Sequence, residues 1–331
     1  MSPPPHGPSS RDRGGPHGPS AGKRVRFRVI PSEEGMILRV WVARRVPGLS
    51  QAAARDLIRA GGVYVNALRV RVPTVRVAPG ERITVYPEAL DATPLDPSLL
   101  QIRHRDAQLL VVDKPAGVAV TATRESAVGT LSDALIRMLE AEGVRRPYVG
   151  VVHRLDRRAS GLVLFTIRGE ANKSIHQAFK DHRIERTYLL ELRGHLTVSQ
   201  TCEVPLRIRR GSSVRVADPG DPRAVTARTH FEPLAQLEDS TVARAQLDTG
   251  RMHQIRVHAA HLGHPVVGDA RYGDPDAAAH ATAAGGLTSP LHLHAQRLAL
   301  THPISGAALE IDTTPPPWAP AFEGTPRKPP A

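Results

Sequence analysis

A chain of 331 residues is long enough for more than one domain, and its 40% hydrophobic and 23% charged content is ordinary for a globular protein. No apolar run approaches the roughly 20 residues that span a bilayer, so we do not expect a membrane protein. The lone cysteine, Cys202, excludes an intramolecular disulfide and a multi-cysteine zinc site. The net charge of +12, carried mostly by arginine, favours a polyanion such as RNA, although a genome rich in arginine codons would produce the same excess.

Residues 1–24 are rich in Pro, Gly, Ser and Arg and have no periodic apolar pattern, which predicts a disordered tail. They also lack the apolar segment of an export signal, so we expect a cytoplasmic location by default.

Residues 36–87 have the pattern of a small domain. The sequence predicts a helix over 38–45 and a second over 50–60, with Ser50 as its N-cap and Gly61-Gly62 as its C-terminal stop. Short strands are predicted at 63–65 and 83–85. The following segment, 88–99, contains Pro94 and Pro97 and is interpreted as a linker that permits relative motion.

The run VVHRLDRRASGLVLFTI, residues 151–167, places a polar cluster between two apolar strand-like segments. An ordinary surface turn does not need this grouping of cations with a carboxylate, so Asp156 is the residue to explain. Either Asp156 pairs with a neighbouring arginine at the end of a strand, or it belongs to a functional site.

Two later runs bear on that choice. ERTYLLELRG, residues 185–194, is typical of a strand in which Tyr188 either packs or meets a reacting group. In LDTGRMHQIRVHAAHLGHPVVGDARYG, residues 247–273, a strand ends at Asp248 and a helix is expected over 252–262. That helix would place Met252, Arg256 and Ala259 on one face, with Arg256 available to pair with Asp156.

The C-terminal third adds little chemistry. Residues 274–286 are an alanine-rich insertion, expected to be a loop or short helix, and the Pro-rich segment 313–331 is predicted to be a disordered tail. The 16 histidines raise the question of a metal, but no HExxH motif or carboxylate ligand set accompanies them. Phosphate-binding glycine motifs are absent, so we expect neither a metal nor another cofactor.

The motifs HRLDRRASGL, ERTYLLEL and TGRMHQIRVHAAHLGHPVVGDARYG resemble, in their order, those of the RluA-type pseudouridine synthases, which isomerise uridine in ribosomal and transfer RNA. LLVVDKPAGV upstream and LHLHAQRLALTHP downstream extend the resemblance over residues 100–312, the expected catalytic domain. One departure is Ala159, where the family usually has Thr; the lost hydroxyl removes one possible hydrogen bond to the aspartate loop.

The first domain resembles the RNA-binding domain named after ribosomal small-subunit protein S-four, through LSQAAARDLIRAGGVYVNALRV and VAPGERITVYP. Ala67 stands where that family often has Gly in a strand-to-strand turn, so a local difference is expected. The resemblance implies an RNA-binding face, which alternatively is a solvated helix face. Its arginines are Arg44, Arg45, Arg55, Arg59, Arg69 and Arg71.

Together the two resemblances imply an α+β fold, with a mainly antiparallel catalytic sheet flanked by helices and preceded by a small α/β domain. They also imply a catalytic set: Asp156 attacks as a nucleophile or abstracts a proton, Arg256 keeps it ionised, and Tyr188 stacks on the uracil and assists proton removal from its fifth carbon. The target base must leave its stack to reach them. Whether the carboxylate attacks sugar or base stays open.

The residues expected to contact RNA are Arg154, His153, Arg251, His253, Arg44, Arg45, Arg55 and Arg59. Arg154 either steadies the flipped nucleotide or makes a phosphate contact or loop ion pair. The prediction is therefore a monomeric RNA pseudouridine synthase, with large-subunit ribosomal RNA favoured over transfer RNA as its partner. The alternatives are an inactive RNA-binding or ribosome-assembly factor and a metal-dependent hydrolase acting through the histidines.

Overall fold

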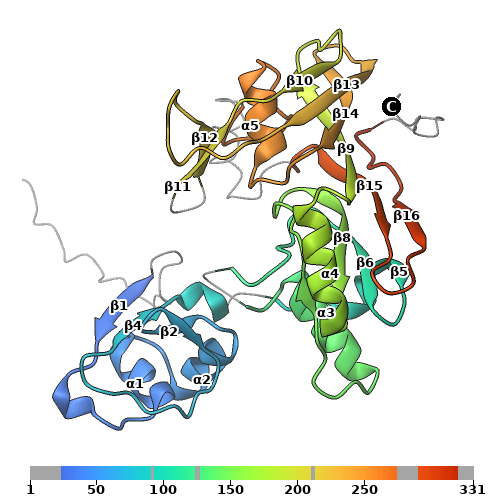
Figure 1. Cartoon of the computed structure of the whole chain (residues 1–331). Coiled ribbons are helices and arrows are strands. Elements are labelled where there is room, and N and C mark those ends of the chain that lie inside the picture. Colours follow the sequence, from blue (N-terminus) through green and yellow to red (C-terminus); the bar gives the residue numbers. More distant parts are fainter. Residues whose placement is uncertain (1–23, 91–92, 124–126, 210–212, 274–289, 320–331) are drawn as a thin grey trace, which may run out of the picture. The chain divides into compact units, whose positions relative to one another are not determined.

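The computed structural model describes residues 24–90, 93–123, 127–209, 213–273 and 290–319 (Figure 1). Its contacts divide the chain into two compact units: Met1–Thr93 with Ala122–Val128, and Pro94–Thr121 with Gly129–Ala331. The boundary at Thr93 falls inside the segment interpreted as a linker. None of the helices in the described residues is long and apolar enough to cross a membrane.

The first unit is a four-stranded antiparallel sheet of order β1-β4-β2-β3 with two helices. Its elements are β1 (Val25–Arg28), η1 (Pro31–Glu33), α1 (Leu38–Arg45), α2 (Gln51–Arg59), β2 (Val63–Val65), β3 (Leu68–Val70), β4 (Arg82–Val85) and η2 (Pro87–Leu90). Both helices bury one face against the sheet, in a core built around Trp41, Leu57 and Ile83, each fully buried.

Both predicted helices of this unit and both predicted strands are confirmed. The Ser50 side chain accepts a hydrogen bond from the Ala53 N–H at 3.1 Å, as expected of an N-cap, and Gly61 ends α2 with φ of +78°. The unit begins earlier than predicted, however, because β1 pairs with β4 ahead of Met36. Its alternating half-buried pattern is too short to stand out in the sequence.

The turn between β2 and β3 keeps its left-handed backbone despite its alanine. Asn66 has φ of +50° and Ala67 φ of +70°, and Val65 pairs directly with Leu68. Such two-residue hairpin turns require positive φ at both positions, which glycine tolerates best. The local difference expected at Ala67 is therefore strain rather than a changed turn.

The second unit is built on a ten-stranded sheet that is antiparallel except where β15 meets β8, which run parallel. Its path is β10-β13-β14-β9-β15-β8-β6-β5, with β16 beside β15 and β7 beside β8. The strands are β5 (Gln101–Arg105), β6 (Leu109–Lys114), β7 (Gly150–Val151), β8 (Ser160–Thr166), β9 (Glu185–Arg193), β10 (Gln200–Cys202), β13 (Thr229–Gln236), β14 (Ser240–Leu247), β15 (Leu293–Thr301) and β16 (Ala308–Asp312). A separate ribbon pairs β11 (Leu206–Arg209) with β12 (Ser213–Val216).

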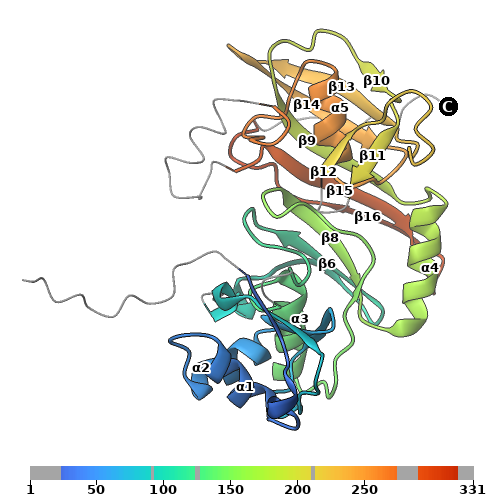
Figure 2. The ribbon, with the colours of Figure 1, turned by 90° about the vertical axis from the view of Figure 1, so that its left-hand side faces the viewer.

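Helices cover the two faces of β6 and β8, which explains why both strands are continuous apolar runs. One face packs against α4 (Gly169–Lys180) through Ile175, and the other against α3 (Leu131–Ala141) through Leu135. Figure 2 shows α4 beside this part of the sheet. The fold class predicted from the sequence, mixed α+β with a mainly antiparallel sheet and flanking helices, is confirmed.

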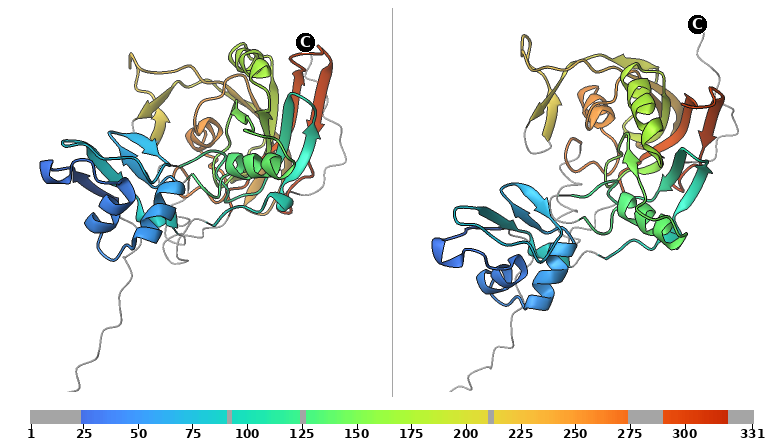
Figure 3. Two further views of the ribbon diagram at one scale, coloured as in Figure 1. Left: turned by 90° about the horizontal axis from the view of Figure 1, so that it is seen from below. Right: turned by 60° about the horizontal axis from the view of Figure 1, so that its bottom comes forward.

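The third helix, α5 (Gln254–His261), lies between the sheet and the ribbon (Figure 3). Ile255 and Ala259 pack on β9 and β14, while Val257 packs against Leu206 and Val214 of the ribbon. The helix is nearly enclosed, so its polar residues must find partners inside the protein. It begins at Gln254, two residues later than predicted, because His253 adopts a left-handed conformation.

The C-terminal segment is ordered further than the sequence suggested. Residues 313–319 were placed in the disordered tail, yet the Thr313 N–H donates to the Gln296 carbonyl and the Trp318 ring stacks on His292 at 4.8 Å. The Trp318 ring is half-buried, and its stacking supplies stabilisation that a proline-rich segment otherwise lacks. The insertion at 274–286, the tail at 1–23 and residues 320–331 lie outside the described residues.

Candidate active site

Asp156 lies in the loop that connects β7 to β8, and a buried lysine holds this loop in place. The Lys114 ammonium donates to the carbonyls of Pro115 and Val118 on one loop and to those of Arg157 and Ala159 on the other. Burial lowers the Lys114 pKa to about 7, with the charge of Asp156 opposing the shift. The lysine therefore ties the backbone that follows the aspartate to the loop after β6.

A second constraint on the loop comes from two hydrogen bonds between Gly117 and Arg157 and from a tight strand approach. The Gly117 N–H donates to the Arg157 carbonyl, and the Arg157 side-chain Nε donates to the Gly117 carbonyl, each at 2.8 Å. Beyond the loop, Gly161 has φ of +104°, and a Cβ there would collide with the backbone of Ala295. Only glycine allows β8 to meet β15 so closely.

Arg256 joins two carboxylates from distant parts of the chain. One guanidinium nitrogen donates to Asp156 Oδ2 at 2.6 Å, and two others bind Asp269 in a bidentate pair at 2.7 Å each. The Asp269 side chain is fully buried, Arg256 is 10% exposed and Asp156 is 23% exposed. The pairing of Arg256 with Asp156 predicted from the sequence is thus present.

The buried end of this triad is strongly charged. Burial opposes ionisation of Asp269, but the hydrogen bonds and charge of Arg256 outweigh it and hold the Asp269 pKa below its usual range. Burial likewise opposes the Arg256 charge, yet Asp269 and Asp156 together raise the Arg256 pKa. The result is a permanently charged guanidinium that presents one nitrogen to Asp156.

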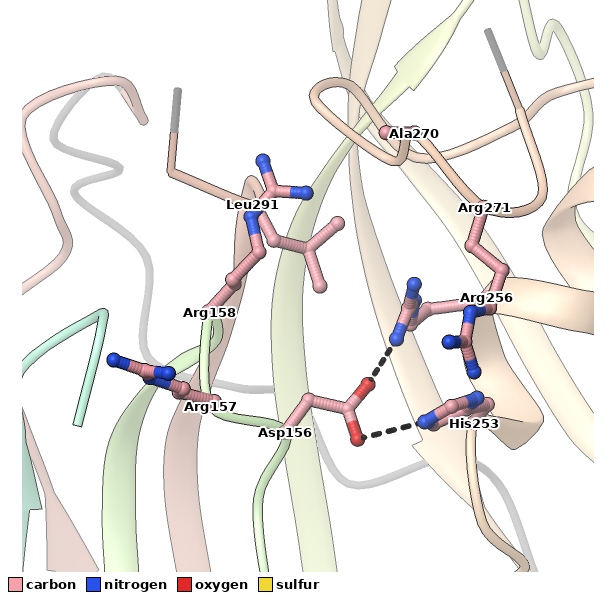
Figure 4. Close-up of a pocket in the computed structure, with 8 residues that line it drawn as sticks. All are labelled: Asp156, Arg157, Arg158, His253, Arg256, Ala270, Arg271 and Leu291. Atoms are coloured by element: carbon pink, nitrogen blue, oxygen red, sulfur yellow. Dashed lines mark hydrogen bonds and ion pairs between the residues drawn. The ribbon is translucent and has the colours of Figure 1, made fainter. Parts of the chain in front are cut away.

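Asp156 opens into a pocket of about 690 Å³ (Figure 4). The lining residues are Asp156, Arg157, Arg158, His253, Arg256, Ala270, Arg271 and Leu291. Figure 4 shows the Asp156 carboxylate directed at Arg256 and His253. Of the lining residues that the structure describes, four are arginines and one is a carboxylate, which favours an anionic ligand with an electrophilic centre at the carboxylate.

His253 also approaches Asp156, with 3.6 Å between its Nε2 and Oδ1. Its Nδ1 is 2.7 Å from the Tyr272 hydroxyl, and the two rings meet edge to face. The sequence placed His253 among RNA contacts; the structure places it in the pocket wall, on the other oxygen of the carboxylate from Arg256.

Tyr188 is 6% exposed and belongs to the apolar cluster beneath the pocket rather than to its lining as far as the described residues show. Burial raises the pKa of its hydroxyl, the charge of Arg186 opposes this and that of Asp156 adds to it. The phenol is therefore neutral at physiological pH and close enough to Asp156 to sense its charge.

The remaining predicted RNA contacts of this unit divide in two. Arg154 is exposed, and the exposed Arg251 donates to the Thr226 carbonyl at 3.0 Å. His153 instead packs on Phe179 and accepts a hydrogen bond from the Leu164 N–H at 2.9 Å. Burial, aided by the charge of Arg186, lowers the His153 pKa to about 3, so this side chain is a neutral part of the loop's support.

The arginines predicted on the first unit are mostly on its surface. Arg44, Arg55 and Arg59 are exposed, and Arg55 pairs with its neighbour Asp56 at 2.9 Å. Arg45 differs: it pairs with the buried Glu33 at 2.7 Å and lies over Trp41, so it also supports the core.

The histidines considered as metal ligands do not gather into one site. Within the described ranges, no group of three or more His, Cys, Asp or Glu side chains has the geometry to hold a metal ion. His258, for example, is buried with its two ring nitrogens near Thr229 Oγ1 and the Val204 carbonyl.

Several residues of the site were not predicted from the sequence, among them the pocket-lining Arg157, Arg158 and Arg271 and three residues that hold the site together. Lys114, Asp269 and Tyr272 all stand in quoted motifs, DKPAGV and GDARYG, but lack periodicity or a partner nearby in sequence. The signal that finds them is a lysine at the end of an otherwise apolar strand, and an acidic residue after a Gly where buried chain should be apolar.

Comparisons with known proteins agree with this architecture. A family model described as RNA pseudouridylate synthase matches residues 108–261, and the S4 domain model matches residues 38–83. Ribosomal large subunit pseudouridine synthase D of Zymomonas mobilis is 32% identical over 82% of this chain and 87% of its own length. Ribosomal large subunit pseudouridine synthase C of Escherichia coli K12 is 30% identical over 90% of this chain and 93% of its own.

Solved structures support the fold. Human RNA Pseudouridylate Synthase Domain Containing 1 matches with a TM-score of 0.54 and 24% identity, over 67% of this chain and 86% of that one. Sequence and fold together define an RNA-modifying isomerase preceded by an S4 domain. The chain belongs to the RluA-type family of RNA pseudouridine synthases.

Proposed function

We propose that this enzyme forms pseudouridine in large-subunit ribosomal RNA with Asp156 as its catalytic carboxylate. The names of the relatives, ribosomal large subunit pseudouridine synthases C and D, support the choice of RNA. The observation that carries the assignment of Asp156 is its position: among the described residues it is the one carboxylate that lines the pocket, and it is held at 2.6 Å by an arginine that a second, buried carboxylate anchors.

The reaction breaks the bond between ribose and the uracil ring nitrogen and joins ribose to the fifth ring carbon, with one proton leaving that carbon and one returning to nitrogen. Asp156 serves either as a nucleophile or as a base toward the sugar, and both roles require the ionised form. Arg256 holds the carboxylate in place through its charge-assisted hydrogen bond of 2.6 Å to Asp156 Oδ2.

The base must be flipped out of its stack before it meets Asp156. Pocket arginines such as Arg157, Arg158 and Arg271 suit the phosphates on either side of the target nucleotide. We assign the exposed Arg154 a contact with the RNA stack from which the target base is flipped. We assign Tyr188 a supporting role beneath the uracil site, because it is a buried, neutral phenol in the apolar cluster under the pocket and not a proton acceptor.

The test is Asp156→Asn, which keeps the side chain's shape and removes its charge. We expect loss of pseudouridine formation of at least 1000-fold, since the Asn amide is neither a nucleophile nor a base, with RNA affinity within a few-fold of wild type. Turnover is measured as tritium release from uridine labelled at its fifth carbon. Asp248→Asn, at an exposed carboxylate paired with Arg228 and His230, is the matched control and should turn over normally.

The RNA target is tested in cells. Pseudouridine is mapped in RNA from cells that lack the gene, or carry the wild type or Asp156→Asn. Sites in large-subunit RNA that only wild type restores support the proposal. Sites restricted to transfer RNA would overturn the substrate, and sites restored by Asp156→Asn would overturn the catalytic residue.

A further inference from the structure

His253 has a backbone conformation that its side chain alone does not explain. It immediately precedes α5 with φ of +55° and ψ of +17°, in the left-handed region, and makes no side-chain hydrogen bond to cap the helix. A residue with a Cβ adopts this conformation at an energetic cost, and such strain is concentrated at functional sites. Because of this conformation, the His253 backbone does not extend the helix and its imidazole lines the pocket.

The hydrogen-bond network around the ring selects one tautomer. The Tyr272 oxygen accepts from the Val214 N–H at 3.2 Å and lies 2.7 Å from His253 Nδ1, and we assign its hydroxyl as the donor of this second hydrogen bond. With Nδ1 accepting, the neutral imidazole carries its proton on Nε2. That nitrogen is the one that faces Asp156 Oδ1 at 3.6 Å.

Burial keeps the His253 ring neutral. It lowers the His253 pKa; the charges of Asp156 and Asp269 oppose the shift, and those of Arg256 and Arg271 add to it. The ring therefore offers a polarised N–H to the carboxylate rather than a second full cation.

Tyr272 itself is held by the same anchor as Arg256. Its backbone N–H donates to Asp269 Oδ1 at 3.3 Å, and its ring lies 5.0 Å below the Arg256 guanidinium. Asp269 thus positions two donors at once: Arg256 directly, and His253 through Tyr272. These donors face the two oxygens of Asp156, Oδ2 and Oδ1 respectively.

We propose that His253 is a positioning residue that sets the rotation of the Asp156 carboxylate, with Tyr272 fixing its tautomer. One donor at Oδ2 leaves the carboxylate free to turn about its Cβ–Cγ bond, whereas donors at both oxygens define its plane and the lone pair that meets the ribose. The 3.6 Å separation closes to a hydrogen bond when substrate fills the pocket, as catalytic contacts often tighten in the complex. The inference rests on Asp156 being the catalytic carboxylate.

Three variants test it: His253→Ala removes the donor, His253→Gln returns an N–H near the position of Nε2, and Tyr272→Phe keeps the ring over Arg256 but loses the hydroxyl. Large-subunit ribosomal RNA from cells lacking the gene is the substrate. The single-turnover rate is read by tritium release and affinity by filter binding. His176→Ala and Tyr148→Phe, at exposed positions, are the matched controls.

We expect His253→Ala to lower the single-turnover rate by 30-fold or more with affinity within threefold of wild type. His253→Gln should recover at least a third of the lost factor on a logarithmic scale, and Tyr272→Phe should lower the rate about tenfold. A purely structural role would not give rescue by Gln together with unchanged affinity.

A fall in affinity with an unchanged rate in His253→Ala would make His253 an RNA contact and overturn the proposal. So would equal rates in His253→Ala and wild type while Asp156→Asn is inactive. An active Asp156→Asn enzyme would instead overturn the catalytic assignment, whatever the histidine variants do.

Discussion

The two units use the same kind of ion pair in opposite ways. On the first unit, Arg55 and Asp56 pair at the surface, with side chains 45% and 52% exposed. In the second unit, Arg256 pairs with Asp156 and Asp269 at similar distances but with the anchor fully buried. Water screens the Arg55–Asp56 pair and leaves both groups free to meet a ligand. The Arg256–Asp269 pair is rigid because both side chains are buried away from water.

This difference in burial indicates which kind of interaction each unit is suited to. A surface of mobile, hydrated arginines suits the sequence-tolerant binding of phosphates, where contacts are many and individually weak. A buried triad suits a reaction that needs one carboxylate in one orientation. Substitutions in the buried triad and in the surface arginines should therefore have different effects.

The largest effect is expected from Asp269→Asn. It leaves Arg256 buried with only the partly exposed Asp156 as a charged partner, so we expect the second unit to lose about 3–5 kcal/mol of stability and the enzyme most of its activity. Urea unfolding followed through Trp318, in a Trp41→Phe background, measures the stability. Asp56→Asn, followed through Trp41 in a Trp318→Phe background, is the control and should leave the unfolding midpoint of the first unit unchanged; equal shifts of the midpoint in the two variants would remove the distinction between the pairs.

A fall in pH should destabilise the second unit more than the first. The folded pKa of His153 is lowered to about 3 and that of His294 to about 4, in both cases chiefly by burial, and His253 and His258 shift the same way. Below pH 6.5 the unfolded chain binds protons that these folded histidines refuse, so stability is lost as the pH falls from 6.5 toward 4. His153 by itself accounts for about 2 kcal/mol at pH 5.

The first unit should resist that change, because residues 24–93 contain no histidine. Burial opposes ionisation of Glu33, but hydrogen bonds from Arg45 and the Ile30 N–H lower its pKa to about 2, so its contribution persists until the pH falls below 4.5. The chain has two tryptophans, Trp41 in the first unit and Trp318 in the second. Thermal unfolding of Trp318→Phe and Trp41→Phe between pH 5 and 7 reports each unit separately, and parallel curves would contradict the prediction.

A smaller effect concerns RNA. Replacing Arg44, Arg55 and Arg59 together with alanine should weaken binding to large-subunit ribosomal RNA and make its salt dependence shallower. Each lost phosphate contact removes about 0.7–0.9 from the log–log slope. The single-turnover rate at saturating RNA should not change, because the pocket is untouched. Replacing Arg168, Arg193 and Arg223 of the second unit gives a charge-matched control; an equal change of slope there would mean that the first unit's arginines are only a solvated face.

The smallest effect is backbone strain at the β2–β3 turn. Ala67→Gly should stabilise the first unit by about 0.5–1 kcal/mol, because glycine adopts φ of +70° without the Cβ penalty. Ala67 does not line the pocket, so the activity should not change. Urea unfolding followed through Trp41 measures the change. The same substitution at His253 relieves similar strain but removes the imidazole, so there a gain in stability should come with a loss of rate; a stable and fully active His253→Gly enzyme would deny any use for the strain.

Local pattern was enough for several elements of the fold. Apolar spacing and the Ser50 cap predicted α1 and α2, and the apolar runs predicted β8 and β9, because periodicity and capping are written over a few neighbouring residues. The same reasoning found Asp156 and Arg256, since a charged group inside an apolar run has few harmless explanations. It began the first unit too late at Met36 and α5 too early at Met252, where a short edge strand and a left-handed residue leave weak marks in the sequence.

From the sequence one can predict which residue types are present at the site: a carboxylate in an apolar run, an arginine on a helix and a tyrosine on a strand. How these side chains are held depends on the tertiary structure. Asp269 and Lys114 gain their roles from contacts with Arg256 and with the Ala159 carbonyl, and His153, expected at RNA, turns instead to the Leu164 N–H. Such pairings depend on which strands become neighbours, and buried polar groups must then find partners across distances that no local period encodes.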